Sequence, residues 1–347
     1  MKLTSTPENL LERLALWLGI APTPISDTHV AFMMARTIMV GAKLGIFEAL
    51  AQQPATAKVI SRNCQTHPNA TLKILNSLVH LGYLSTTPQQ EYQLTRLSRK
   101  WMLQESEKSV YDKMILQFVE WKLVEHYENY VRSGEPADMH QILSEEEWEI
   151  YQKGMRSMAK VSAWEVAKRT PIPKRANYLL DVGGAHGYYS VALCQKYPDL
   201  KATILDLPEA IKYAGPLLSE ENMAHKVKHQ AGNVLTIDLG EAVYDVVFIS
   251  SLVHHFDADT NTMLAQKIFT ALKPGGYYII QEFIRDDKAR KGDYLAILDL
   301  YFAATSQSGT WSVKEMSGWQ KKAGFEPYKI IRLRSIPRHV QVVGKKV

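Results

Sequence analysis

The sequence predicts an α/β fold in which a doubly wound, seven-stranded and mostly parallel sheet follows an all-helical N-terminal domain with a winged-helix pattern. Three observations predict it. From Tyr178 onward, short apolar runs typical of buried strands alternate with helical segments, which indicates a parallel sheet. A glycine-rich turn at 183–187 follows the first of these runs. The first 105 residues instead read as helices followed by two short strand-like runs.

In the N-terminal part, Asp27 can cap a helix that runs to about Leu50, because apolar residues recur along one face of this segment. Tyr83-Leu84-Ser85 and Glu91-Tyr92-Gln93-Leu94 flank a Thr-Pro-Gln-Gln turn, which predicts a hairpin. Further helices are expected over residues 8–20, 56–63 and 69–82, and residues 106–168 are expected to be mostly helical with a break at Pro136.

In the C-terminal part, a short helix is expected from about Tyr188 until Pro198 stops it, and another between Phe256 and Lys273. The last two strands are joined by a short turn and are therefore expected to pair antiparallel. The expected strands are residues 178–182, 202–207, 227–231, 244–250, 276–283, 327–333 and 338–344.

With 347 residues, the chain is long enough for two domains. We expect a winged-helix-like domain at 1–105, a helical linker at 106–170 and a sheet domain at 171–347. The net charge of +5 comes without a block of Lys or Arg, which argues against a nucleic-acid-binding face.

Two cysteines far apart in sequence, and an N-terminus without the pattern of a signal peptide, predict a cytoplasmic protein. The most apolar stretch, 30–50, is interrupted by Arg36 and Lys43, so no membrane span is expected.

Residues 178–207 form a β-α-β unit that predicts a nucleoside-bearing cofactor. Gly183 opens the turn after the first strand, and Asp206 lies 23 residues later at the end of the second. A carboxylate there is placed to bind two ribose hydroxyls. The glycines do not match the Gly-x-Gly-x-x-Gly spacing of a diphosphate-binding turn, and this favours a nucleoside with an amino-acid end.

Several short motifs carry a resemblance to a known family. They are Asp181-Val-Gly-Gly, Leu205-Asp206-Leu207-Pro208, Val253-His254, Leu272-Lys-Pro-Gly-Gly and Tyr151-Gln-Lys-Gly-Met155. Residues 178–283 resemble an S-adenosylmethionine-dependent class I methyltransferase, which has a Rossmann-like fold. From about Asp27 onward, the chain is similar to dimeric plant and bacterial small-molecule O-methyltransferases of the caffeate and hydroxyindole type. The resemblance implies S-adenosyl-L-methionine as cofactor and a homodimer formed through the N-terminal domain.

The same resemblance assigns the cofactor site. Asn233 stands where the family usually has Asp, and Phe256 stands where it has a tryptophan, with adenine stacking or simple core packing as its alternative roles. The expected cofactor-binding residues are Asp181, Gly183, Asp206, Leu207, Asn233, Val234, Ser250 and Phe256.

For the chemistry, His254 matches the family's catalytic histidine just beyond the end of a strand, and a histidine suits proton removal from a hydroxyl near neutral pH. A helix cap or a core position is its alternative role. Glu282 matches an acid that orients this histidine. A second such acid is replaced by Thr310, and the acid beside the histidine is replaced by His255. No metal-site spacing occurs among the His, Cys, Asp and Glu residues.

The expected acceptor is a small aromatic or polyketide-like hydroxyl compound, with Met155, Met158 and Phe302 lining its pocket; core packing would account for these side chains equally well. Two alternatives remain open. One is C- or N-methylation, or a non-methylating reaction, on the same fold. The other, a winged-helix DNA-binding regulator, is weakened because the would-be recognition helix at 69–82 carries only Lys73 as a positive charge.

Overall fold

The computed structural model describes residues 7–285 and 295–347. It divides into two compact units, with the boundary between Phe118 and Val119. This boundary falls inside helix α7 (Tyr111–Val124), within the segment 106–170 that the sequence predicts as a linker. Each unit has its own apolar core, and each is described separately below.

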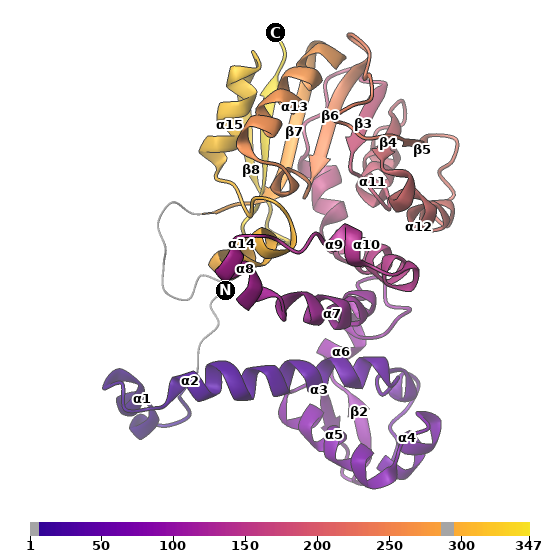
Figure 1. Ribbon diagram of the computed structural model, residues 1–347. Coiled ribbons are helices and arrows are strands. Elements are labelled where there is room, and N and C mark those ends of the chain that lie inside the picture. The colour runs from indigo at the N-terminus through magenta and orange to yellow at the C-terminus, as the bar shows by residue number, and fades with distance from the viewer. Residues whose placement is uncertain (1–6, 286–294) are drawn as a thin grey trace. The chain divides into compact units, whose positions relative to one another are not determined.

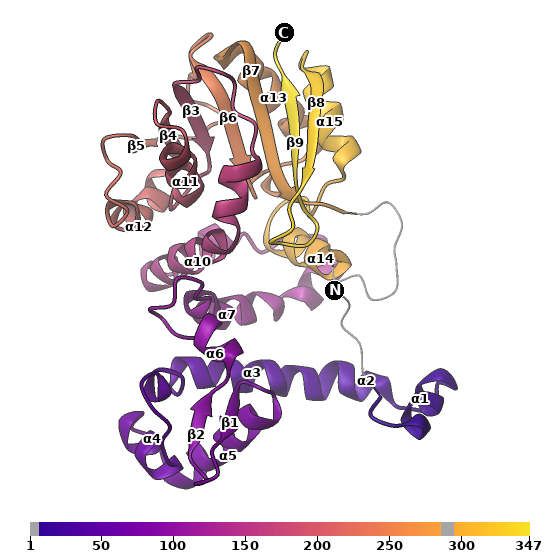
Figure 2. The ribbon, with the colours of Figure 1, turned by 180° about the vertical axis from the view of Figure 1, so that it is seen from behind.

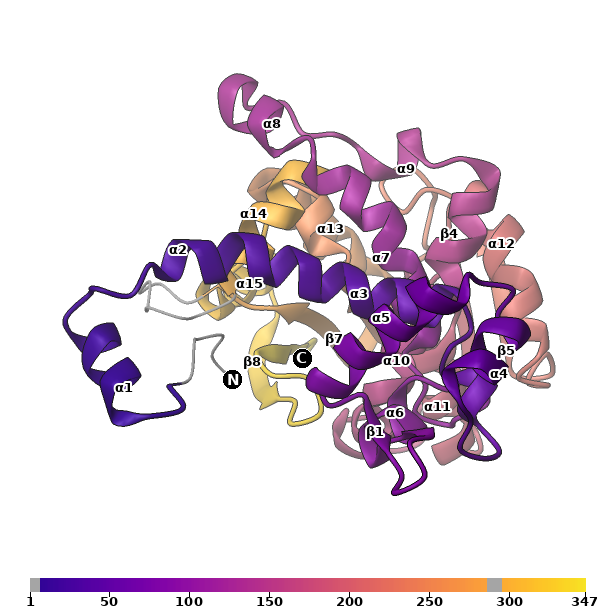
Figure 3. The ribbon, with the colours of Figure 1, turned by 90° about the horizontal axis from the view of Figure 1, so that it is seen from below.

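The N-terminal unit combines helices with the expected two-stranded hairpin (Figure 3). Its core lies between α3, α5 and the hairpin, around Phe47, Leu75 and Leu78. The long helix predicted to reach residue 50 instead ends at Lys43, because Gly45 takes a left-handed conformation with φ of 74°. The elements are α1 (Leu10–Trp17), α2 (Thr23–Ile25), η1 (Ser26–Val30), α3 (Ala31–Lys43), η2 (Glu48–Leu50), α4 (Ala57–Asn63), α5 (Pro68–His80), β1 (Leu84–Thr86), β2 (Tyr92–Leu94) and α6 (Arg96–Trp101).

The C-terminal unit contains the predicted seven-stranded sheet, in the order β5-β4-β3-β6-β7-β9-β8 (Figure 1). The first five strands in this order are parallel, and β9 and β8 are antiparallel to their neighbours. The prediction that the last two strands pair antiparallel is confirmed. The strands are β3 (Tyr178–Val182), β4 (Lys201–Asp206), β5 (Val227–Ala231), β6 (Tyr244–Ser250), β7 (Leu272–Phe283), β8 (Glu326–Arg332) and β9 (His339–Lys345).

The start of β7 differs from the prediction by four residues, whereas β4, β8 and β9 differ by one residue at each end. β7 begins at Leu272 rather than at Gly276, because Leu272 already pairs with Tyr244 of β6 ahead of a register shift. The Lys-Pro-Gly-Gly segment therefore lies within the strand and does not form a separate turn before it.

Helices cover both faces of the sheet (Figures 1 and 2). Apolar residues of α10 and α11, such as Val166 and Val191, pack on one face, whereas α13 and α15 supply Ile268 and Trp319 to the other. No helix among the described residues is both long and apolar enough to cross a membrane. The remaining helices of this unit are α8 (Tyr127–Ser133), α9 (Met139–Ile142), α10 (Glu145–Arg169), α11 (Tyr188–Lys196), α12 (Pro208–Ser219), η3 (Val253–His255), α13 (Ala258–Ala271), α14 (Leu295–Thr305) and α15 (Val313–Lys322).

The start of the longest helix, α10, is fixed by its sequence. Ser144 accepts a hydrogen bond from the Glu147 N–H, and the Glu147 carboxylate accepts one from the Ser144 N–H. This capping box and the acidic first turn stabilise the N-terminus of α10. The first turns of α10 supply Trp148, Tyr151 and Gln152 to the lining of a cavity at the carboxyl edge of the sheet.

Candidate active site

A cavity of 570 Å³ opens at the carboxyl ends of β3, β4, β5 and β6. Open α/β sheets bind their ligands at this edge. The loops that follow the four strands form one wall, and the start of α10 with the segment before it forms another. Its lining includes Pro136, Asp138, Trp148, Tyr151, Gln152, Gly183, Ala185, Asp206, Leu207, Asn233, Val234, Ser251, Leu252, His255, Phe256 and Ser306.

The turn after β3 has a backbone conformation that disfavours residues larger than glycine at position 183. Gly183 has φ of 65°, and a Cβ atom there would lie 2.9 Å from the Leu252 side chain. Ala185 is also left-handed, with φ of 44°, an uncommon conformation for a residue with a Cβ. Its N–H donates to Asp206 Oδ2 at 2.8 Å, and its carbonyl accepts from His229 Nε2 at 2.7 Å. These two bonds hold the Ala185 backbone from both sides.

Asp206 ends β4 and lines the cavity. Its Oδ1 accepts a hydrogen bond from the Leu207 N–H at 2.8 Å, so that each carboxylate oxygen has one backbone donor and keeps further lone pairs. Burial raises the pKa of this carboxyl, whereas the two backbone hydrogen bonds and His229 lower it. The carboxylate is therefore positioned and still able to accept hydrogen bonds from a ligand.

Asp181 does not line the cavity but lies beneath the turn. Its Oδ2 accepts a hydrogen bond from Ser190 Oγ at 2.6 Å, and its Oδ1 has no hydrogen-bond partner among the described residues. A Cβ at Gly184 would lie 2.5 Å from the Asp181 carboxyl carbon. Burial raises the pKa of Asp181 to about 7, and the nearby charge of Asp206 adds to this increase.

His254 and Glu282 meet although 28 residues separate them in sequence. His254 Nδ1 lies 3.0 Å from Glu282 Oε2, and their side chains are 5% and 0% exposed. The second oxygen of Glu282 accepts from the Phe283 N–H at 2.9 Å. Phe302 of α14 stacks on the His254 ring, with ring centres 4.2 Å apart and planes 22° apart. These contacts fix the imidazole ring of His254.

The other expected residues divide into two groups. Leu207, Asn233, Val234 and Phe256 line the cavity with Gly183 and Asp206. Ser250 does not: its hydroxyl accepts a hydrogen bond from Gln281 inside the sheet, and its neighbour Ser251, with φ of 53°, lines the cavity instead.

Met155 and Met158 are half-buried and do not line the cavity either, because its lining on α10 ends at Gln152. No feature of the sequence predicts a role for Trp148. Tyr151 and Gln152 do carry a signal, since they begin the Tyr-Gln-Lys-Gly-Met motif. The part of α10 that lines the cavity therefore lies about one turn closer to the helix N-terminus than the sequence predicts.

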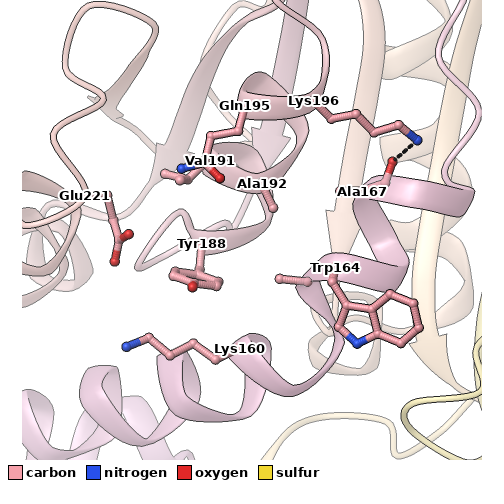
Figure 4. A pocket seen from close by; sticks show the side chains of 10 residues that line it. Lys160, Trp164, Ala167, Tyr188, Val191, Ala192, Gln195, Lys196 and Glu221 are labelled. Carbon is pink, nitrogen blue, oxygen red and sulfur yellow. Dashed lines mark hydrogen bonds between the residues drawn. The ribbon is translucent and has the colours of Figure 1, made fainter. Parts of the chain in front are cut away.

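A second cavity, of 450 Å³, lies between α10 and α11 (Figure 4). Its lining includes Lys160, Trp164, Tyr188 and Gln195, with Glu221 at one side, and contains none of the expected site residues. Figure 4 shows the Lys196 side chain directed to the carbonyl of Ala167, which accepts its hydrogen bond. The candidate active site is therefore the larger cavity at the sheet edge.

Comparison with known proteins finds methyltransferases that are similar to this chain. The chain is 21% identical to a 3-hydroxy-5-methyl-1-naphthoate 3-O-methyltransferase of Streptomyces sahachiroi, covering 94% of this chain and 95% of the relative. It is 28% identical to an L-tyrosine C(3)-methyltransferase of Streptomyces lavendulae, covering 52% of this chain and 49% of the relative. Human N-acetylserotonin methyltransferase, solved in complex with SAM, shares the fold with a TM-score of 0.84 at 18% identity, covering 99% of both chains.

Two family descriptions match the chain in sequence order. Residues 27–104 match the O-methyltransferase dimerisation domain, and residues 127–326 match the O-methyltransferase domain. The second match contains the β3 turn, Asp206 and the His254–Glu282 pair. Because it spans more than half of the 347 residues, the chain belongs to the O-methyltransferase family.

Proposed function

We propose that this protein transfers a methyl group from S-adenosylmethionine to a hydroxyl of a small aromatic or polyketide-like molecule, with His254 as the general base. The observation that carries the proposal is the buried hydrogen bond between His254 and Glu282. Neither these two side chains nor Phe302 lines the cavity at the sheet edge, but Leu252 and His255, on either side of Val253 and His254, do. The naphthoate O-methyltransferase relative supports the acceptor class, since it matches almost the whole chain.

The residues at the β3 turn fit the proposed cofactor. Gly183 and Ala185 present backbone to the cavity, and the Asp206 carboxylate lies at the end of the next strand with lone pairs for ribose hydroxyls. Bound S-adenosylmethionine supplies a methyl group on a positively charged sulfur, which is open to in-line displacement by an oxygen nucleophile.

Glu282 sets the proton position on His254. An ionised carboxylate can only accept hydrogen bonds, so Nδ1 of His254 carries the proton and donates it, which leaves Nε2 with its lone pair. Nε2 is then the atom that would take the proton of the acceptor hydroxyl. The Glu282 carboxylate would stabilise the resulting imidazolium, as a buried acid paired with a catalytic histidine does.

The cavity wall favours a flat, largely apolar acceptor. Trp148 and Tyr151 from α10 line the cavity together with Leu207 and Phe256 from the strand loops. Burial raises the pKa of the Tyr151 phenol far above its ordinary value, so this side chain stays neutral and acts as a wall rather than as an acid or base. Aromatic and apolar linings of this kind bind aromatic ligands in a dry environment.

The proposal is tested with His254→Gln, using His225→Gln at an exposed position as the matched control. A panel of hydroxylated naphthoates, each paired with its hydroxyl-free analogue, is incubated with radiolabelled S-adenosylmethionine. We expect His254→Gln to lower methyl transfer by about 10²–10⁴-fold, the usual contribution of a general base. Its affinity for S-adenosylhomocysteine, measured by calorimetry, is expected to match that of the wild type. Full turnover in this variant would remove the base assignment.

C-methylation is the second candidate. It is favoured by the L-tyrosine C(3)-methyltransferase relative and by Thr310, which occupies a position where the resemblance leads one to expect an acid. An activated ring carbon needs no proton removal before it attacks a methyl group. A product whose new methyl signal in NMR belongs to carbon, formed equally by the wild type and His254→Gln, would establish this alternative.

We also propose that the protein is a homodimer formed through its N-terminal unit. Several large apolar side chains of this unit are exposed, among them Leu10 (78%), Trp17 (80%) and Phe32 (50%). Exposed large apolar side chains favour association with a partner, and residues 27–104 match the dimerisation domain. Sedimentation equilibrium at micromolar concentration is expected to give twice the chain mass of 39.4 kDa; a monomer mass would contradict the proposal.

A further inference from the structure

We propose that Asp299, acting through Thr310, is a positioning residue for His254, and this inference rests on the proposed role of His254 as general base. Thr310 is completely buried, and both its N–H and its hydroxyl donate to the same oxygen, Asp299 Oδ1, with an N-to-O distance of 2.7 Å. The acid that the resemblance leads one to expect at position 310 is therefore replaced by a threonine that binds an acid from α14.

The segment that carries Thr310 is held tightly on this carboxylate. Gly309 has φ of 73°, and a Cβ there would lie 2.9 Å from Asp299 Oδ1 and 3.1 Å from the Asp299 carbonyl oxygen. On the other side, the Thr310 carbonyl accepts a hydrogen bond from Arg285 Nη1 at 2.6 Å. Arg285 in turn binds both carboxylate oxygens of Glu315. The Asp299 carboxylate thus binds the N–H and the hydroxyl of Thr310, and the Arg285 guanidinium binds its carbonyl.

The same segment binds the backbone of η3, which carries the histidine. The Ser308 N–H donates to the His254 carbonyl at 3.2 Å, and Trp311 Nε1 donates to the Val253 carbonyl at 3.1 Å. Two successive carbonyls at His254 are therefore held by residues on either side of Thr310. The Val253 carbonyl also accepts a hydrogen bond from Asn261, whereas the hydrogen bond to the His254 carbonyl comes from this segment, so its displacement is expected to shift His254 relative to Glu282.

Helix α14 also contacts the histidine directly. Phe302, which stacks on the His254 ring, lies three residues after Asp299 and therefore on the same face of the helix. One helix face thus fixes His254 in two ways: Phe302 restrains its ring, and Asp299 restrains its backbone through Thr310. Because an error of about 1 Å in a catalytic group can cost about 10²-fold in rate, loss of the Asp299 contact is expected to lower turnover without weakening cofactor binding.

The experiment compares Asp299→Ala, Thr310→Val and Thr310→Ser, with Asp259→Asn at an exposed position of α13 as the control for loss of a carboxylate. Each full-length protein is labelled with ¹³Cε1-histidine and saturated with S-adenosylhomocysteine, and His254→Gln identifies the His254 signal. We expect Asp299→Ala and Thr310→Val to shift the His254 signal and its pH titration. Thr310→Ser and Asp259→Asn are expected to retain the wild-type values.

Turnover with a naphthoate that the wild type methylates gives the second measurement. We expect kcat to fall by about 10–10²-fold in Asp299→Ala, with an unchanged dissociation constant for S-adenosylhomocysteine. If folded Asp299→Ala and Thr310→Val both leave the His254 signal, its titration and kcat unchanged, the proposal is overturned. If His254→Gln itself turns over normally, the base assignment fails, whereas the NMR comparison still decides whether Asp299 positions the histidine.

Discussion

Asp181 makes the stability of the C-terminal unit depend on pH in an unusual direction. Its pKa in the folded protein is about 7, against an ordinary value of 3.8, because burial disfavours the carboxylate. The folded state therefore holds a proton that the unfolded state releases between pH 4 and 7. Because the folded state binds more protons in this range, the contribution of Asp181 to stability is present below pH 4 and is lost as the pH rises through 7.

The size of the effect follows from the shift. At about 1.4 kcal/mol for each unit of pKa, a change from 3.8 to about 7 corresponds to about 4 kcal/mol at high pH. Between pH 5 and pH 8 the expected loss is about 2–3 kcal/mol. An asparagine at this position keeps a hydrogen bond to Ser190 Oγ and does not ionise, so Asp181→Asn is expected to lack this component.

The assay is urea unfolding of the wild type and Asp181→Asn at pH 5 and pH 8, followed by tryptophan fluorescence. Buried His186 and His339, whose pKa values are lowered to about 3 and 4, titrate in both proteins and cancel in the comparison. We expect the free energy of unfolding of the wild type, relative to the variant, to fall by about 2–3 kcal/mol from pH 5 to pH 8. A constant difference, or one that changes in the opposite direction, would refute the reasoning.

Three further substitutions test the site. Asp206→Ala removes charge-assisted hydrogen bonds, so calorimetry with S-adenosylmethionine is expected to show binding weaker by about 2–4 kcal/mol. Unchanged binding would show that the cofactor does not bind in this cavity. Gly183→Ala places a Cβ 2.9 Å from Leu252 at a φ of 65°, and thermal unfolding is expected to reveal a destabilisation of about 1–3 kcal/mol, whereas a wild-type melting temperature would argue against a strained turn. Glu282→Gln keeps the shape but removes the charge beside His254, so the initial rate of methyl transfer is expected to fall while S-adenosylhomocysteine binding persists; an equal rate would show that the charge is unnecessary.

The sheet could be predicted closely from the sequence because its buried strands are short apolar runs bounded by glycine, proline and polar residues. The prediction placed β3, β5 and β6 at the residues that the structure assigns. The pairing of His254 with Glu282 is expected from the family resemblance alone. The structure brings the two together because β6 and β7 are parallel neighbours whose carboxyl ends meet at one edge.

The other features of the site depend on tertiary packing, which leaves no local pattern in the sequence. Asp299 and Thr310 meet only because α14 folds back against the segment that follows it, and neither residue carries a periodic signal for this contact. On α10, the helical pattern does not show where the cavity ends. The sequence therefore predicts Met155 in the cavity lining, whereas the structure places Tyr151 and Gln152 there.

The two hydrogen bonds that hold the Ala185 backbone have a consequence for the rate of ligand binding. Its N–H and its carbonyl both bond to groups of the same chain, Asp206 and His229, so neither needs a ligand atom as its partner. The conformational entropy of this turn is therefore lost when the chain folds and not when a nucleoside arrives. We expect association to proceed without a slow ordering step, and the Ala185 amide to exchange slowly with solvent deuterium even in the ligand-free enzyme.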